Sequence, residues 1–157
     1  MKKSNNKGFT LVELVVVIAI IGVLAAILVP SMMGYVKKSR LKTANGNAKT
    51  AYNAIAVVVT DKETAGTPLT FPSAFETIDG KNGSGASDSD VADAVKDALA
   101  DNGNEAGQVA FGAATINGQA TFFCQWRKTS SDDIFGQYPQ AIKKVSQCTG
   151  WGTWKNV

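Results

Sequence analysis

Residues 7–36 read KGFTLVELVVVIAIIGVLAAILVPSMMGYV, and this stretch decides the fold of the chain. The 23 residues from Leu14 to Val36 carry no charge. A helix rises about 1.5 Å per residue, so a helix over this run is long enough to cross a hydrocarbon core of about 30 Å. The sequence therefore predicts a long apolar helix that spans a membrane.

The segment ahead of the run is basic, with Lys2, Lys3 and Lys7 before any apolar residue. A basic start followed by an apolar run is also typical of a removable secretory signal. Such a signal ends in an A-x-A pattern of small residues, which does not follow this run. We therefore expect the apolar segment to be retained.

Two residues are unusual for a plain membrane anchor. Glu13 lies inside the apolar stretch, where an uncompensated carboxylate costs several kcal/mol. Pro30 removes one helical hydrogen bond in the last third of the run. One interpretation is that Glu13 sits at a helix N-terminus, favoured by the helix dipole, while Pro30 only kinks the span. The residues around Glu13 suggest a more specific interpretation.

A basic leader, Gly8 before Phe9, Glu13 four residues later and then an apolar helix together resemble the processing motif of type IV prepilins. The resemblance implies that residues 1–8 form a leader peptide, which a prepilin peptidase removes by cutting between Gly8 and Phe9. It also implies methylation of the new Phe9 amine. In this family the carboxylate equivalent to Glu13 pairs with the amine of a neighbouring subunit, which would make Glu13 a registry device during assembly.

The resemblance extends through Gly22 and Pro30 to about Tyr35. It implies that the helix between Gly22 and Pro30 loosens in a filament. It also implies a subunit stored as a single-pass protein of the cytoplasmic membrane, in contact with lipid, and then moved by a membrane assembly platform into an extracellular homopolymeric pilus, or fimbrium. Such a filament serves adhesion, motility or DNA uptake, and its surface ligand would be a host surface, a carbohydrate or DNA.

Two alternatives share the same N-terminal half. One is a pseudopilin of a type II secretion or competence DNA-uptake system, which builds a short piston. The other is a minor adhesive pilin, in which the anchor serves to display a binding module. No P-loop or dinucleotide fingerprint is present, and the 157 residues include no histidine. We therefore expect neither an enzyme, nor a metal site, nor a cofactor.

The apolar pattern continues beyond Arg40 as one face of an amphipathic helix. Its apolar residues recur at spacings of three and four: Leu41, Ala44, Ala48, Ala51, Tyr52, Ile55, Val58 and Val59. We predict one helix over residues 9–62, with residues 14–36 in the membrane or filament core. Its second half would pack on a head formed by residues 63–157.

The head is predicted to contain a long loop, a short helix and a β-hairpin. The loop covers residues 79–90, and the short helix follows with Ser89 or Asp90 as its cap. Asn117-Gly118 is a strong two-residue turn signal between strands at 109–116 and 119–127. A further strand is expected within residues 138–148. A long helix followed by an antiparallel sheet is an α+β, pilin-like architecture.

Cys124 and Cys148 are the chain's two cysteines and enclose 23 residues. Many type IV pilins staple a C-terminal loop to the sheet, and outside the cytoplasm a disulfide is the expected state. We therefore predict a Cys124–Cys148 bridge, which contributes about 3–4 kcal/mol in the chain-entropy model. The alternative is two unlinked buried thiols.

The remaining candidates are aromatic, acidic and basic. Trp151 and Trp154 would either pack in the core or present flat faces to a surface ligand. The acidic residues between 88 and 105 would cap and solvate a helix or, alternatively, bind calcium. The basic residues at 37–42 would form a solvated face or contact lipid headgroups, nucleic acid or acidic faces of neighbours.

Charge is segregated along the chain, although the net charge is only +3. Three lysines of the leader account for all of that excess. Residues 9–60 carry a net +4, residues 61–126 a net −7 and residues 127–157 a net +3. Such blocks predict complementary lateral faces between subunits.

Overall fold

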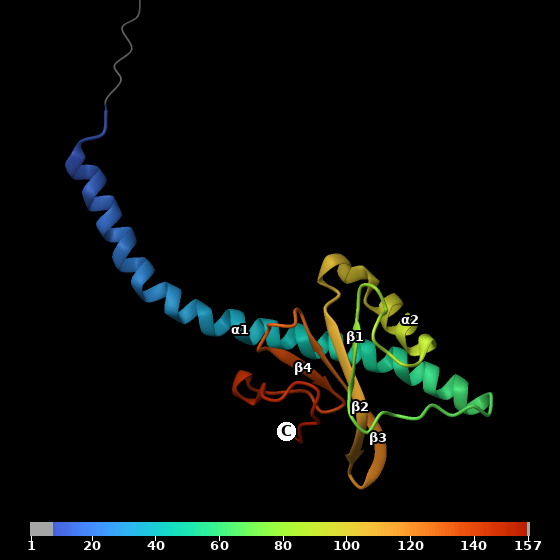
Figure 1. Cartoon of the computed structure of the whole chain (residues 1–157). Helices are drawn as coiled ribbons and strands as arrows, with labels where there is room; N and C mark the ends of the chain where they lie inside the picture. The colour runs from blue at the N-terminus through green and yellow to red at the C-terminus, as the bar shows by residue number, and fades with distance from the viewer. Residues whose placement is uncertain (1–7, 157) are drawn as a thin grey trace, which may run out of the picture. The chain divides into compact units, whose positions relative to one another are not determined.

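The structure is a computed structural model that describes residues 8–156, so the lysines of the predicted leader lie outside the described residues. The chain divides into two compact units, Met1–Val36 and Lys37–Val157. Helix α1, Leu11–Thr64, runs through both (Figure 1). The predicted helix over residues 9–62 is therefore confirmed to within two residues at each end.

The part of α1 in the first unit makes no packing contacts that bury it. Every residue from Gly8 to Val36 is exposed, and the helix is continuous through Pro30. By length and composition α1 is the one helix among the described residues that is apolar enough to cross a membrane. Exposed apolar surface of this extent requires cover from lipid or from other chains.

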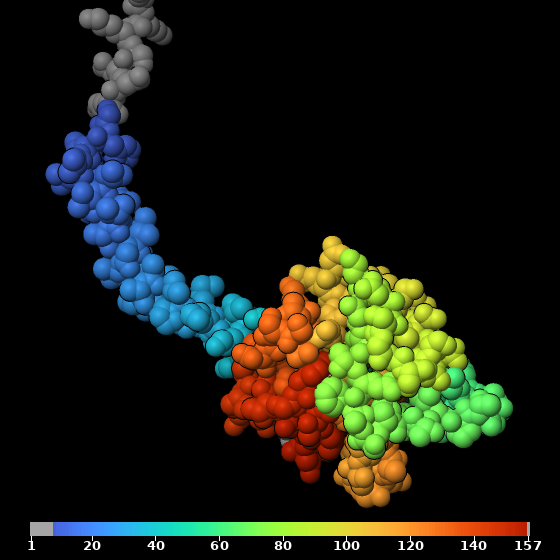
Figure 2. Space-filling model, in the orientation of Figure 1, coloured from blue at the N-terminus to red at the C-terminus, as the bar shows by residue number. Residues whose placement is uncertain are grey.

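The head contains a four-stranded antiparallel sheet in the order β1-β2-β3-β4 (Figure 1). The strands are β1, Glu76–Asp79; β2, Gln108–Ile116; β3, Gln119–Arg127; and β4, Phe135–Tyr138. The β2–β3 hairpin is the one predicted. Asn117 and Gly118 both have positive φ, 53° and 79°, as a two-residue turn that matches the twist of the strands requires. The hairpin tip protrudes from the head in Figure 2.

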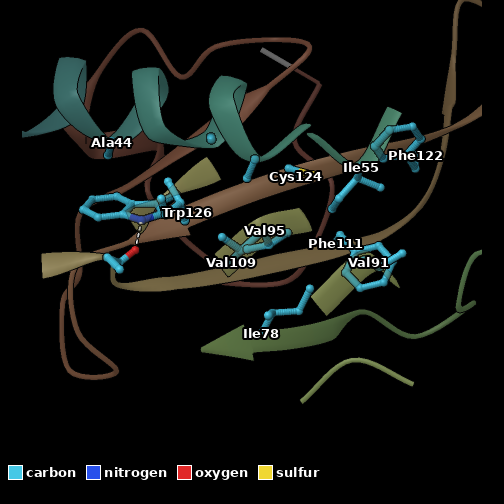
Figure 3. Packing of buried hydrophobic residues seen from close by; sticks show 14 residues of the cluster. Ala44, Ile55, Ile78, Val91, Val95, Val109, Phe111, Phe122, Cys124 and Trp126 are labelled. Carbon is cyan, nitrogen blue, oxygen red and sulfur yellow. Dashed lines mark hydrogen bonds between the residues drawn. The ribbon is translucent and has the colours of Figure 1, made fainter. Parts of the chain in front are cut away.

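Alternation along the strands places one face of the sheet against α1. Phe122, Cys124 and Trp126 of β3 point to this side, where they join a single core cluster (Figure 3). The Trp126 indole Nε1 donates to the Ala106 carbonyl oxygen at 2.7 Å. Helix α1 contributes the predicted apolar face, of which five residues are fully buried: Leu41, Ala44, Ala48, Ala51 and Ile55.

Small residues bring α1 and β4 into unusually close contact. Ala44, Ala48 and Ala51 of α1 are at most 1% exposed. Gly136 of β4 packs against the backbone of this part of the helix. A Cβ atom at Gly136 would lie only 2.0 Å from the Ala44 carbonyl carbon. Only glycine fits at this crossing of helix and strand.

Helix α2, Ser89–Ala98, lies on the same side of the sheet and adds Val91 and Val95 to the core. The sequence analysis predicted its cap at Ser89 or Asp90, which is wrong by one or two residues. The cap is Asp88, whose side chain accepts hydrogen bonds from the backbone N–H groups of Asp90 and Val91. A 3₁₀ helix, η1, follows at Ala100–Glu105.

The last strand differs from the sequence prediction. It was expected within residues 138–148, but β4 is Phe135–Tyr138, and the later residues form a loop with a short 3₁₀ helix, Val145–Gln147. Pro139 directly follows the strand and has no N–H to donate to a ladder. Strand β1 was not predicted, because its four residues include two acidic ones and are too short to show alternation.

Candidate functional site

The start of α1 is organised around Thr10 and Glu13. The Thr10 backbone N–H and hydroxyl both donate to Glu13 Oε2, at 2.9 and 2.8 Å. In return the Glu13 backbone N–H donates to Thr10 Oγ1 at 3.2 Å. This reciprocal arrangement is a capping box, in which a Thr and a Glu three residues later satisfy the free donors of a helix N-terminus.

The structure confirms the interpretation that Glu13 lies at a helix N-terminus; the sequence analysis left out only its side-chain partner, Thr10. T-x-x-E at residues 10–13 is itself the signature of a helix start, and the structure places Glu13 in the first turn. Both hydrogen bonds to the carboxylate end on Oε2, and among the described residues Oε1 accepts none. The local role of Glu13 therefore leaves one carboxylate oxygen available to a second partner.

The Gly8–Phe9 bond lies immediately ahead of this helix start. Gly8, Phe9 and Thr10 have no regular structure, and the Phe9 side chain is 85% exposed. A Cβ atom at Gly8 would meet nothing within 4 Å. Among residues 8–156, nothing obstructs the approach of an enzyme to this bond.

Gly22 and Pro30 both lie inside the uninterrupted helix α1. Pro30 carries no N–H for the helical ladder, and glycine weakens a helix by about 1 kcal/mol relative to alanine. Loosening between these residues stays a prediction.

The predicted Cys124–Cys148 disulfide is wrong for this structure, in which both thiols are free. Cys124 points into the core between the sheet and α1, as its place in the β3 alternation predicted. Cys148 packs in a second cluster with Ile134 and Phe135, and its Sγ donates to the Phe135 carbonyl oxygen at 3.3 Å. The sequence spacing defines how many residues separate the two cysteines, but not the directions in which their side chains point. Burial raises the pKa of both thiols, so both are protonated and weakly nucleophilic at neutral pH.

Trp151 and Trp154 pack against the head. The Trp151 ring lies 5.7 Å from the Phe135 ring, with the Arg127 guanidinium 4.3 Å from its centroid. The Trp154 ring lies 5.8 Å from that of Phe123. These contacts support the packing alternative for both residues, while a ligand role stays a prediction.

Two glutamines that the sequence did not single out hold the C-terminal segment. Gln125 and Gln137 are fully buried on the sheet face away from α1, and Gln125 Nε2 donates to Gln137 Oε1 at 3.0 Å. Gln125 also binds the backbone of Gly152 and Thr153, and Gln137 that of Lys155. Alternation along β3 puts Gln125 on the face opposite Cys124 and Trp126, where a polar side chain is ordinary, so no local pattern marks it as a residue that holds the C-terminal segment.

The acidic stretch is used in part for capping and ion pairing. Lys62 Nζ lies 2.8 Å from both Asp88 and Asp90, and this links the end of α1 to the start of α2. The Lys62 ammonium holds the pKa of the Asp88 carboxyl below its ordinary value. Within residues 8–156, no three histidine, cysteine or acidic side chains gather where a metal ion could bind.

The basic cluster after the apolar run is exposed. Arg40 pairs with Asp132 at 2.6 Å, while Lys37, Lys38 and Lys42 make no ion pair among the described residues. Their role is not fixed by contacts within the chain.

The N-terminal motif and the helix behind it are similar to those of known proteins. A family model described as the prokaryotic N-terminal methylation motif matches residues 3–29. The chain therefore carries this motif, ahead of a long apolar helix and an α+β head.

The relatives define the class more narrowly. The type IV major fimbrial protein FimA of Dichelobacter nodosus is 42% identical over 64 residues, which is 41% of each chain. The fimbrial protein EcpC of Eikenella corrodens is 45% identical over 62 residues, 40% of each chain. The type IV major pilin protein PilA of Myxococcus xanthus is 41% identical over 59 residues, 38% of this chain and 27% of that protein.

These matches confirm the resemblance to type IV pilins, and the matched proteins are named as fimbrial proteins or pilins. The chain spans about two fifths of the length of the first two relatives. No solved structure matches it.

Proposed function

We propose that the chain is a structural subunit of a type IV pilus. The observation that carries the proposal is the wholly exposed apolar part of α1, directly behind the methylation motif. Nineteen large apolar side chains between Phe9 and Val36 are exposed, and each gains roughly 1.5–3 kcal/mol when it leaves water. Lipid covers them before assembly, and the same segments of neighbouring subunits cover them in the filament.

Processing prepares the subunit for assembly. A prepilin peptidase on the cytoplasmic side cuts the open Gly8–Phe9 bond, and the new Phe9 amine is methylated. The subunit then waits in the cytoplasmic membrane until the assembly platform adds it to an extracellular filament. Repeated head-to-tail contacts that do not close generate such filaments.

Glu13 has two separable roles in this proposal. Its backbone and Oε2 close the capping box with Thr10, which holds the helix start in shape. Its charge and Oε1 receive the Phe9 amine of a neighbouring subunit. A carboxylate in an apolar filament core is tolerated only when that partner is in register.

Three forms of the chain test the proposal. Glu13→Leu removes both the cap and the charge, and we expect a cleaved, membrane-inserted subunit that assembles poorly. Glu13→Gln keeps a side chain suited to the capping box but removes the charge. If the charge pairs with the neighbouring amine, Glu13→Gln also assembles poorly.

Electron microscopy with antibody to the head reads the outcome. Long labelled fibres from the unaltered chain support a major subunit, and labels restricted to fibre tips indicate a minor adhesive pilin. An absence of fibres supports a pseudopilin instead. Normal filaments from Glu13→Gln, with none from Glu13→Leu, would restrict Glu13 to helix capping and refute the charge pairing.

A further inference from the structure

Two unpaired stripes of opposite charge lie on opposite edges of the head. The acidic stripe consists of Asp93 and Asp97 on α2 and Asp101 on η1. All three are exposed, and none makes an ion pair within the described part of the chain. Asp93 and Asp97 are one helical turn apart, on the side of α2 that faces away from its buried Val91 and Val95.

Lys96 does not neutralise this stripe. It is the basic residue of α2, and its aliphatic stem packs beside Gly83, where a Cβ atom would lie 3.3 Å from Lys96 Cβ and Cδ. The stem therefore follows the loop before α2, and the three carboxylates face solvent.

The basic stripe consists of Lys38, Lys42 and Lys49 on α1. Spacings of four and seven place them along one flank of the helix. All three are exposed and unpaired among residues 8–156, although the Lys49 ammonium lies 5.7 Å from the Tyr138 ring centroid, near the outer limit for attraction to a ring. Lys143 and Lys144, also exposed, continue the positive charge on the adjoining loop.

Asn45 fixes where the basic stripe lies. It occupies the same flank of α1, where its Oδ1 accepts hydrogen bonds from the backbone N–H groups of Gln137 and Ile142. The basic stripe therefore borders β4 and the loop after it. The acidic stripe borders β1, because α2 packs beside that strand. With the strand order β1-β2-β3-β4, the stripes flank opposite edges of one sheet (Figure 1).

We propose that the acidic stripe of one head docks on the basic stripe of a second copy of this chain. The inference rests on the proposed pilus and names the lateral contact between its heads. The carboxylates of the acidic stripe repel one another, and so do the lysines of the basic stripe. Contact with a stripe of opposite charge relieves the repulsion in each. Because the two stripes are different surfaces, the contact is head-to-tail and leaves one free stripe of each kind for the next subunit. A self-complementary patch would instead stop at a dimer.

Charge reversals in the full-length chain, expressed in cells that assemble the unaltered protein, test this contact. Asp93→Lys with Asp97→Lys makes the acidic stripe repel its partner, and Lys42→Glu with Lys49→Glu does the same from the other side. We expect each double variant to reduce the yield of sheared filaments by about tenfold or more. Combining all four substitutions restores the opposite signs, and we expect it to recover most of the yield.

A matched control separates the contact from net charge. Asp61→Lys with Glu63→Lys changes the charge by the same amount as the acidic reversal, at two exposed residues outside both stripes. We expect this variant to assemble normally. A second readout needs no substitution, because a carbodiimide joins lysine to carboxylate only at direct contact. Mass spectrometry of cross-linked filaments should find Lys42 or Lys49 joined to Asp93 or Asp97 in filaments but not in detergent-solubilised subunits.

The outcomes separate the two claims. If the unaltered chain forms no filaments, both the pilus and the contact are wrong. Suppose instead that the unaltered chain forms filaments and the acidic reversal forms as many. If the filaments of both chains are equally sensitive to salt and the cross-link is absent, only the contact is wrong. The contact would also be overturned if the control variant at Asp61 and Glu63 lost as much filament yield as the acidic reversal. The same holds if combining all four reversals did not restore the yield.

Discussion

Replacement of Gly136 by alanine should be the most damaging single-methyl change in the head. The new Cβ atom would lie 2.0 Å from the Ala44 carbonyl carbon and 2.1 Å from the Asn45 backbone nitrogen, whereas ordinary contact begins near 3.4 Å. Both obstacles are backbone atoms of α1, so no side chain can rotate away. Helix and strand must separate by about 1.4 Å to restore contact distance.

That separation also reaches the hydrogen bonds of Asn45. The bond from the Gln137 backbone N–H to Asn45 Oδ1 is 3.0 Å long and would open beyond hydrogen-bonding distance. Overpacking costs about 1–3 kcal/mol, and each lost hydrogen bond about 1 kcal/mol. We therefore expect Gly136→Ala to lower the free energy of unfolding by about 3–5 kcal/mol, a large part of a typical total of 5–15 kcal/mol.

Gly46→Ala is the matched control. It adds the same methyl group two residues beyond Ala44, on the exposed side of α1, where a Cβ atom meets nothing within 4 Å. Alanine is favoured over glycine in a helix by about 1 kcal/mol, so this variant should gain stability. Urea unfolding of the detergent-solubilised full chain, followed by fluorescence of its three tryptophans, all in the head, measures both. A loss of less than about 1 kcal/mol in Gly136→Ala would refute the close helix–strand contact.

Three further predictions follow from the head. Asn45→Ala removes hydrogen bonds to Gln137 and Ile142, and should lower the free energy of unfolding by about 2–4 kcal/mol in the same urea assay; an unchanged midpoint would contradict the bonding described. Non-reducing mass spectrometry should find two free thiols, with Cys148 alkylated before the fully buried Cys124; a mass two hydrogens lower would show the bridge. The lowered pKa of Asp88 means that its ion pair contributes stability above the ordinary carboxyl pKa, which is lost as pH falls through the lowered value. Asp88→Asn keeps a capping side chain and should flatten the fall in urea midpoint as the pH drops below the ordinary carboxyl pKa of about 4, whereas the same slope in both proteins would exclude this contribution.

The features that sequence could predict are those encoded locally. The Asn117-Gly118 turn defined the hairpin to within one residue, because both positions need positive φ. The apolar spacing on α1 identified the face that packs on the sheet. At the N-terminus, the motif singled out Gly8, Phe9 and Glu13, but its T-x-x-E content was not interpreted as a capping box.

The features that sequence missed depend on contacts between distant segments. The cysteine spacing allowed a bridge, but Cys124 and Cys148 belong to separate clusters because β3 and the C-terminal loop orient them independently. Gln125 looks like any strand residue until the C-terminal segment covers it. The need for glycine at position 136 arises only from the approach of α1, 92 residues earlier in the chain.

The two buried glutamines that hold the C-terminal segment have a consequence for sequence variation in that segment. Gln125 and Gln137 bind it through main-chain atoms, the Gly152 and Lys155 N–H groups and the Thr153 and Lys155 carbonyl oxygens. Every residue type except proline offers both groups, so the attachment does not depend on which outward side chains the segment carries. Gly152 is the exception, because a Cβ atom there would overlap the Phe75 ring. The exposed side chain of Thr153 can be exchanged while the segment stays fastened. The head thus separates the part of its surface that is free to diverge from the two buried side chains that hold it in place.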